Sequence, residues 1–145
     1  MRAARALVGI VAGTTAAVEP TVTIVQLRTL VVVATHSHPR LSDLASALSV
    51  HPSNASRVVD RLIRKGMLAR SVSSSDRRSV TLVLTPAGSD LVDSVMVRRR
   101  SALHRAMASM PADQRAAVAT AFEAFADAVG EVRDDGAWPD TGVTS

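Results

Sequence analysis

The fold of this 145-residue chain is decided by residues 41–85, LSDLASALSVHPSNASRVVDRLIRKGMLARSVSSSDRRSVTLVLT. The first eight of them, residues 41–48, place leucine and alanine at helical spacing, and we expect a short helix there. Pro52 follows a break and can open a second helix, because the first helical position needs no backbone N–H donor. Gly66 is suited to end that helix in a left-handed conformation. The pattern predicts a helix-turn-helix.

The second of these helices, residues 52–65, has an apolar side and a polar side. The apolar stripe repeats at helical spacing and consists of Ala55, Val58, Val59, Leu62 and Ile63. We call the opposite side the polar face; it consists of Ser53, Asn54, Arg57, Asp60, Arg61 and Arg64. The helix is therefore expected to rest on a core and to present small polar and arginine side chains outward.

Two runs with the composition of β-strands come next, residues 68–72 and 80–84, joined by residues 73–79. We expect them to form an antiparallel hairpin, or wing. The segment between them holds one acid and two arginines: Asp76, Arg77 and Arg78. The expected fold class is therefore mainly α, an α+β winged helix-turn-helix with about six helices and a two-stranded β wing.

Length and composition predict a single structural domain, and we expect the protein to be cytoplasmic. Hydrophobic residues are 47% of the chain but aromatic residues only 2%, so the core must be built from Leu, Val and Ala. The lack of cysteine excludes disulfides and thiolate metal sites. No apolar run reaches the roughly 18 residues that span a bilayer. The basic and apolar N-terminus briefly resembles a signal peptide but has no clear cleavage site, so neither export nor a membrane partner is expected.

The positive charge is concentrated in the second helix and the wing. The whole chain has a formal net charge of +4, whereas residues 51–80 hold seven basic residues and two acids. The rest of the chain is therefore slightly acidic. All but one of these basic residues are arginine, which forms bidentate contacts with phosphate and guanine. This distribution predicts a polyanionic partner.

Helices are also expected on both sides of the winged segment, over residues 3–18, 23–35, 85–108 and 112–132. The one at 23–35 begins with a capping box formed by Thr23 and Gln26. It is apolar nearly all round, and its expected core stripe is Ile24, Leu27, Val31 and Ala34. In the helix at 85–108, Thr85 is the expected cap, and the triple arginine at 98–100 is expected to be solvated. Long-range attraction of DNA is the alternative role for that triplet.

The terminal helices carry apolar stripes that one small domain can hardly cover. In the last helix the stripe is Val118, Ala121, Phe122, Phe125, Ala128, Val129 and Val132. We expect a homodimer in which residues 1–20 and 86–133 form the dimerisation region and residues 21–85 the DNA-binding region. Residues 134–145 are expected to be a flexible acidic tail. Two-fold symmetry would set the two copies of the helix at residues 52–65, which we call the reading helix, about 34 Å apart, or one turn of DNA.

Six short motifs, taken together, resemble the MarR family of bacterial winged-helix transcriptional regulators. They are VTIVQ at 22–26, LSDLA at 41–45, SRVVDRL at 56–62, KGMLAR at 65–70, DRR at 76–78 and LTPAG at 84–88. Each is loose alone, but their order and spacing over residues 3–132 are specific. The resemblance implies a homodimer whose recognition helix enters the major groove of double-stranded DNA and whose wing reaches the minor groove. It also implies that a small molecule often binds between the dimer helices and the DNA-binding lobe.

The resemblance assigns roles to individual positions. Ser53, Asn54 and Arg57 would face bases or phosphates, and Arg61 would contact the DNA backbone. Asp60 is expected to restrain Arg57 or Arg64 instead of touching DNA. The wing would contribute Arg78 as its minor-groove residue, with Asp76 as its support and Arg77 as a second DNA contact.

Three positions depart from the family pattern. Arg40 stands where a small hydroxyl residue commonly caps the first helix of the motif, and Ser49 occupies a turn position that is often glycine. His51 stands where Asp, Ser or Thr more often caps the recognition helix. We expect His51 to cap weakly and to leave backbone N–H groups free for phosphate or water.

Simpler explanations exist for the same residues. The polar face could be a solvated set of salt bridges, and Arg77 and Arg78 an ordinary charged hairpin tip. Some members of the resembled family sense zinc, but His36 and His38 have the character of surface loop residues, so no metal or other cofactor is expected. No nucleophile elbow, phosphate-binding glycine loop or metalloprotease pair is present, so an enzyme is not expected.

The expected function is sequence-specific transcriptional regulation by a homodimeric repressor that a small-molecule effector releases from a pseudo-palindromic operator. A ligand-independent activator or an architectural regulator is one alternative. A winged-helix protein–protein module without DNA binding is another. The chain has no tyrosine and few aromatic residues, so an effector pocket would lack ring-stacking partners. We therefore expect an aliphatic effector or none, and assign no ligand-binding residues.

Overall fold

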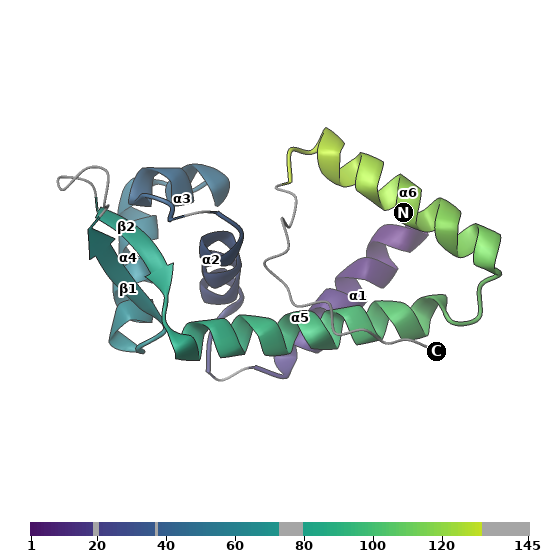
Figure 1. Cartoon of the computed structure of the whole chain (residues 1–145), viewed down its shortest axis with the longest axis horizontal. Helices are drawn as coiled ribbons and strands as arrows, with labels where there is room; N and C mark the ends of the chain where they lie inside the picture. The colour runs from purple at the N-terminus through teal and green to yellow at the C-terminus, as the bar shows by residue number, and fades with distance from the viewer. Residues whose placement is uncertain (19–20, 37, 73–79, 132–145) are drawn as a thin grey trace.

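The computed structural model describes residues 1–18, 21–36, 38–72 and 80–131, and within them it has six helices and one two-stranded sheet (Figure 1). The elements in chain order are α1 (Arg2–Ala16), α2 (Ile24–Thr35), α3 (Leu41–Ala47), α4 (Pro52–Arg64), β1 (Leu68–Val72), β2 (Val80–Leu84), α5 (Pro86–Met107) and α6 (Ala112–Ala128). The expected fold class, a mainly helical winged helix-turn-helix, is confirmed.

The elements form two ends joined by one long helix. Figure 1 shows α2, α3, α4 and the hairpin at one end, and α1 and α6 at the other. Helix α5 begins beside the hairpin and runs along the molecule to the α1 end. Any change in the angle between the two ends must therefore involve α5 or the segment between α1 and α2.

The core of the winged end is aliphatic. Every element of this end contributes, and the buried side chains of the core include Leu27, Leu30, Leu44, Val59, Leu62, Leu68, Leu82, Val92 and Val95. The last two come from α5, so the start of that helix belongs to the same core. This agrees with the expectation of a core built from Leu and Val.

Helix α2 has the predicted ends but only part of the predicted core face. The capping box is present, because the backbone N–H of Gln26 donates to Thr23 Oγ1 and the backbone N–H of Thr23 donates to the side-chain Oε1 of Gln26. Leu27 is in the core, whereas Ile24 is 64% exposed and Val31 and Ala34 are only partly buried. Because Val31 and Ala34 still pack against the core, the stripe prediction was wrong only for Ile24. A helix that is apolar nearly all round has no dominant face, so its orientation depends on its neighbours.

The turns of the winged end follow local backbone chemistry. The Arg40 amide donates to Asp43 Oδ2 at 2.9 Å, so α3 is capped from its third residue in place of a hydroxyl side chain. Ser49 has φ +54°, a left-handed conformation that costs a residue with a Cβ roughly 1–2 kcal/mol. Gly66, with φ +70°, ends α4 as predicted.

The hairpin has the predicted boundaries. Its strands pair antiparallel from Leu68 opposite Leu84 to Val72 opposite Val80. The Leu82 amide donates to the carbonyl of Pro39 at 2.9 Å, which ties the second strand to the loop before α3. The hairpin is therefore fixed to the helix-turn-helix through backbone as well as side chains.

The helices of the other end differ more from expectation. The last helix ends at Ala128 instead of continuing to Val132, and Gly130 follows it with φ +72°. No residue of α6 is buried, and in α1 only Thr14 and Thr15 are. None of the helices among the described residues is long and apolar enough to cross a membrane. The expected acidic tail, residues 134–145, lies outside the described residues.

Candidate nucleic-acid interface

Helix α4 is held so that the predicted polar face points outward. Ala55, Val59 and Leu62 are buried in the core, and Val58 and Ile63 are partly buried beside them. All six residues of the polar face are exposed. Four of the predicted DNA-binding residues, Ser53, Asn54, Arg57 and Arg61, therefore share one accessible surface.

The start of α4 is capped by His51. Its Nδ1 accepts a hydrogen bond from the Ser53 amide at 3.3 Å, and the Ser53 hydroxyl lies 2.8 Å from the same nitrogen. The amide contact is long for a hydrogen bond, in keeping with the weak cap that the sequence suggested. Ser53 is thus partly engaged in capping, while the Asn54 side chain makes no hydrogen bond within the described residues.

Asp60 has a different partner from the one expected. Its Oδ1 accepts from the Arg70 guanidinium at 2.8 Å, so the ion pair joins α4 to β1. Among the described residues, the Arg64 guanidinium donates a hydrogen bond only to the backbone carbonyl of Asp60, at 3.4 Å. The expectation that Asp60 restrains Arg57 or Arg64 was wrong, because the nearest guanidinium comes from the strand. Both side chains of the pair are about half exposed, so its contribution to stability is small.

Lys65 also has internal partners. Its Nζ lies 2.6 Å from the Thr21 carbonyl oxygen and 3.2 Å from Gln26 Oε1. Sequence reasoning counted Lys65 among the basic residues facing a polyanion and did not foresee this contact. Its partners precede it by 44 and 39 residues, so no local pattern could have revealed it.

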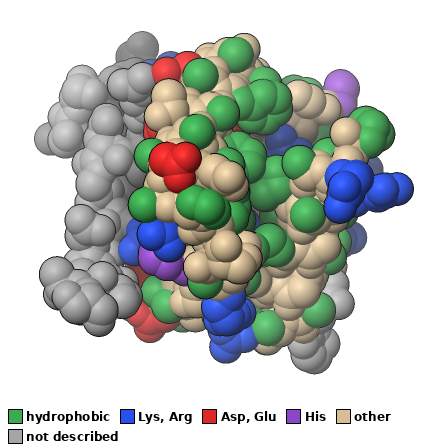
Figure 2. Space-filling model, turned by 90° about the vertical axis from the view of Figure 1, so that its right-hand side faces the viewer, with side chains coloured by type: hydrophobic (Ala, Val, Ile, Leu, Met, Phe, Trp, Pro, Cys, Tyr) green, Lys and Arg blue, Asp and Glu red, His purple; other side chains and the backbone are tan. Residues whose placement is uncertain are grey.

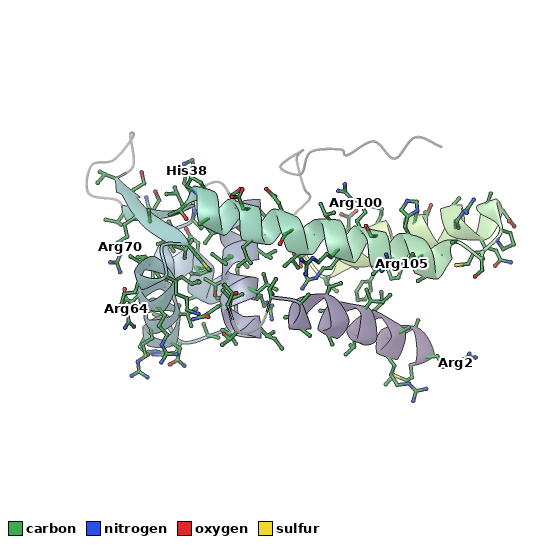
Figure 3. All side chains as sticks on the ribbon, turned by 90° about the horizontal axis from the view of Figure 1, so that it is seen from below. Arg2, His38, Arg64, Arg70, Arg100 and Arg105 are labelled. Atoms are coloured by element: carbon green, nitrogen blue, oxygen red, sulfur yellow. The ribbon has the colours of Figure 1, made fainter. Side chains whose placement is uncertain are left out.

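Fewer of the seven basic residues at 51–80 are therefore free to bind a polyanion than the sequence suggests. The side chains of Arg57 and Arg61 make no hydrogen bond or ion pair with other described residues, whereas those of Arg70 and Lys65 do. Figure 3 shows Arg64 and Arg70 at the end of the molecule formed by α4 and the hairpin. The wing residues Asp76, Arg77 and Arg78 lie outside the described residues.

The triple arginine in α5 is not uniformly solvated. Arg98 and Arg100 are exposed as expected, but Arg99 is partly buried. Its guanidinium donates to the hydroxyls of Thr14 and Thr15 in α1, at 3.4 Å each. Burial lowers the pKa of the Arg99 guanidinium from its ordinary value. The solvation prediction was wrong for Arg99, because this side of α5 packs on α1.

A groove of about 530 Å³ lies between α1 and α5. Its first wall is made of Gly9, Ile10, Gly13 and Thr14 of α1 and of Ala17, the residue after that helix. Its second wall, from α5, is made of Val97, Arg98, Ser101, Ala102 and Arg105. Small residues leave the space open, and two arginines make it basic. No aromatic side chain of the described residues lines it. In the part of the chain that the structure describes, no three His, Asp or Glu side chains gather as a metal site would require.

A reading helix on an aliphatic core beside a β-hairpin defines the winged helix-turn-helix class. Known proteins agree with that class. The sequence profile described as the MarR family matches residues 22–80. This chain belongs to the MarR family, and the curated relatives that it matches are transcriptional regulators, not enzymes.

Individual relatives are similar over different lengths. The HTH-type transcriptional repressor MdtR of Bacillus subtilis is 32% identical over 58% of this chain and 54% of its own length. The transcriptional repressor MprA of Escherichia coli is 30% identical over 51% of this chain and 42% of its own length. The match thus spans about half the length of these relatives. The structure of RV1404 from Mycobacterium tuberculosis is 36% identical with a TM-score of 0.81, over 91% of this chain and 90% of that chain.

Proposed function

We propose that this MarR-family protein is a homodimeric repressor that binds a pseudo-palindromic operator through α4 and the wing. The observation that carries the proposal is the exposed polar face of α4, which lies opposite side chains fixed in the core. Short side chains near the helix start, Ser53 and Asn54, permit close approach to base edges. Arg57 and Arg61 have no competing partner among the described residues and are suited to guanine or phosphate.

The homodimer is supported by apolar surface that the chain itself does not cover. Phe125 is 63% exposed on α6, and Val8 is 67% exposed on α1. Figure 2, a view of this end of the molecule, shows hydrophobic side chains spread over the surface, with basic side chains near its edges. A second copy would bury this surface through the proposed dimerisation region, residues 1–20 and 86–133. Residues 21–85 would then face DNA, which implies a protein of the cytoplasm.

Release by a small molecule is the proposed form of regulation. DNA binding by BpsR of Bordetella bronchiseptica, a protein of similar fold with 24% identity and a TM-score of 0.61, is regulated by 6-hydroxynicotinic acid. A ligand beside the dimer helices would favour one separation of the two α4 helices over another, and so change operator affinity. The groove between α1 and α5 offers no ring-stacking partner, which favours an aliphatic effector.

The test is binding to the DNA upstream of its own gene, and to operators selected from a random library, titrated with salt and unlabelled competitor. Arg57→Ala is expected to weaken specific binding by about 1–3 kcal/mol, because a bidentate or phosphate contact is lost. Arg78→Ala is expected to weaken it too, with an intact dimer. Arg100→Ala is the matched control, since it removes the same charge from the far half of α5 (Figure 3).

Two results would overturn the proposal. One is wild-type binding that disappears with random competitor and selects no sequence, which would favour a winged-helix module that binds protein. The other is an equal effect of Arg57→Ala and Arg100→Ala, which would mean that attraction is non-specific. Promoter fusions would separate repression from activation.

A further inference from the structure

Lys65 joins two parts of the molecule that are distant in the sequence. It is the C-cap residue of α4, and its ammonium group reaches back to the segment that connects α1 to α2. One hydrogen bond goes to the backbone carbonyl of Thr21 at 2.6 Å, and a second goes to Gln26 Oε1 at 3.2 Å. The contact therefore lies where the chain leaves α1 and enters α2, between the two ends of the molecule.

The acceptors of this contact are fixed. Gln26 is only 5% exposed, and its Oε1 also accepts the Thr23 amide at 3.1 Å in the capping box of α2. Two donors meet at this oxygen, so the amide must present its carbonyl group and not its NH₂ group. The Lys65 ammonium therefore meets the carbonyl oxygen of Thr21, whose own amide donates to the Val18 carbonyl at 2.8 Å, and the side-chain oxygen of Gln26, which the capping box of α2 holds in place.

This contact adds a directional interaction to the non-directional apolar packing of the winged end. Apolar packing of Ala55, Val59 and Leu62 holds α4 on the core, but hydrophobic contact is non-directional. A charge-assisted hydrogen bond has a preferred length and direction. Together with the negative end of the α4 dipole, which favours a cation at this position, it fixes the end of α4 against Thr21 and the first turn of α2.

We propose that Lys65 is a positioning residue: it sets the orientation of the reading helix relative to α1, and it does not bind DNA phosphate. In a dimer joined through α1, this orientation determines the separation of the two α4 helices and hence the preferred spacing of operator half-sites. The consequence for DNA rests on the proposed function; the consequence for the α1–α4 geometry does not.

The geometry can be measured without DNA, because the chain has no cysteine to interfere with labelling. Spin labels on Ala4→Cys and Ser53→Cys, diluted with unlabelled protein, report the distance from α1 to α4 within one chain. Lys65→Met keeps the aliphatic stem but removes the ammonium group, and we expect it to broaden this distance distribution in a protein that remains folded. Arg61→Met, the matched control on the same helix, is expected to leave the distribution as it is. Equal distributions in all three proteins would overturn the proposal.

A second measurement separates positioning from phosphate contact. With operators whose half-sites are moved by one base pair, Lys65→Met is expected to lose about tenfold in affinity for the native spacing, as expected for a hydrogen bond to a charged group. It should also lose most of its preference among spacings, while the salt dependence stays as in the wild type. Arg61→Met should instead lower the slope of the salt dependence by about one and keep the spacing preference. A reduced slope in Lys65→Met would identify a phosphate contact and overturn the proposal.

Gln26→Glu gives an independent variant in case Lys65→Met does not fold. Glutamate can keep the capping box with Thr23 and adds a charge for Lys65. The distance distribution should then be at least as narrow as in the wild type, and the spacing preference at least as strong. A broader distribution would contradict the proposal that the contact between Lys65 and residue 26 holds α4 in place. Failure of the wild type to bind any operator would refute the proposed function and leave the labelling result to decide the role of Lys65.

Discussion

Gly88 lies where the first turn of α5 passes closest to the hairpin. A Cβ at this position would be 2.1 Å from the Met67 carbonyl oxygen, a backbone atom that no rotamer change can move. We expect Gly88→Ala to lower the free energy of unfolding by about 1–3 kcal/mol, the cost of overpacking. Urea unfolding at fixed protein concentration would measure it. Ser89→Ala, one position further on, is the control and should change stability by less than about 0.5 kcal/mol; equal effects would contradict the close approach.

Residue identity predicted the local contacts of the site but not the distant ones. His51 caps α4, and Gly66 ends it, because each acts on backbone within a few residues. The helical spacing predicts a partner for Asp60 on the same helix, yet Asp60 pairs with Arg70 across the α4–β1 connection. Several arginines were available to one carboxylate, and the choice among them depends on how the strand crosses the helix.

At the scale of elements, we expect the contact between α1 and α5 to depend on the aliphatic stem of Arg99 more than on its charge. The two hydrogen bonds to Thr14 and Thr15 are long, at 3.4 Å, and the guanidinium is partly desolvated. We therefore expect Arg99→Met, which keeps the packing of the stem, to change the free energy of unfolding by less than about 1 kcal/mol. Arg99→Ala should cost about 1–2 kcal/mol, because it also removes the buried methylene groups.

Thermal and urea unfolding of the two Arg99 variants, at one protein concentration, would measure this difference. Concentration must be held constant because association of the chain changes its apparent stability. An Arg99→Met variant as unstable as Arg99→Ala would show that the hydrogen bonds, and not the stem, hold α1 on α5.

The sequence predicted the helix starts that are marked by a capping side chain or a proline. Thr23 and Gln26 start α2, Pro52 starts α4, and Thr85 caps α5 by accepting from the Gly88 amide. The end of α6 was placed too late, because the apolar stripe continues past Ala128 while the backbone turns at Gly130. Periodicity describes which side chains share a face, but a glycine in a left-handed conformation decides where the helix stops.

At the scale of the whole molecule, α6 should be the part most sensitive to dimer formation. Phe125 is exposed in the single chain, so Phe125→Asp is expected to leave the protomer folded. In the proposed dimer it would place a charge in an apolar interface and raise the dissociation constant at least about thirtyfold, the effect of a 2 kcal/mol hot spot. Sedimentation equilibrium would measure this, with operator binding as a second readout.

Thr120→Asp is the control for the dimer prediction. Helical geometry places residue 120 on the other side of α6 from Phe125, so the added charge should stay in solvent. Dimerisation that survives Phe125→Asp unchanged, or a wild-type chain that is monomeric at all concentrations, would contradict the proposed interface.

The sequence by itself determined the order of elements, most of their boundaries and the outward polar face of α4. These properties depend on caps, turn residues and helical periodicity, all of which act within a few positions along the chain. Only the tertiary structure decided the face that α2 turns to the core, the partner of Asp60, the burial of Arg99 and the contact of Lys65 with Thr21 and Gln26. The reason is physical: a uniformly apolar helix has no preferred side, and a charged side chain pairs with whichever group the packing of distant elements brings within reach.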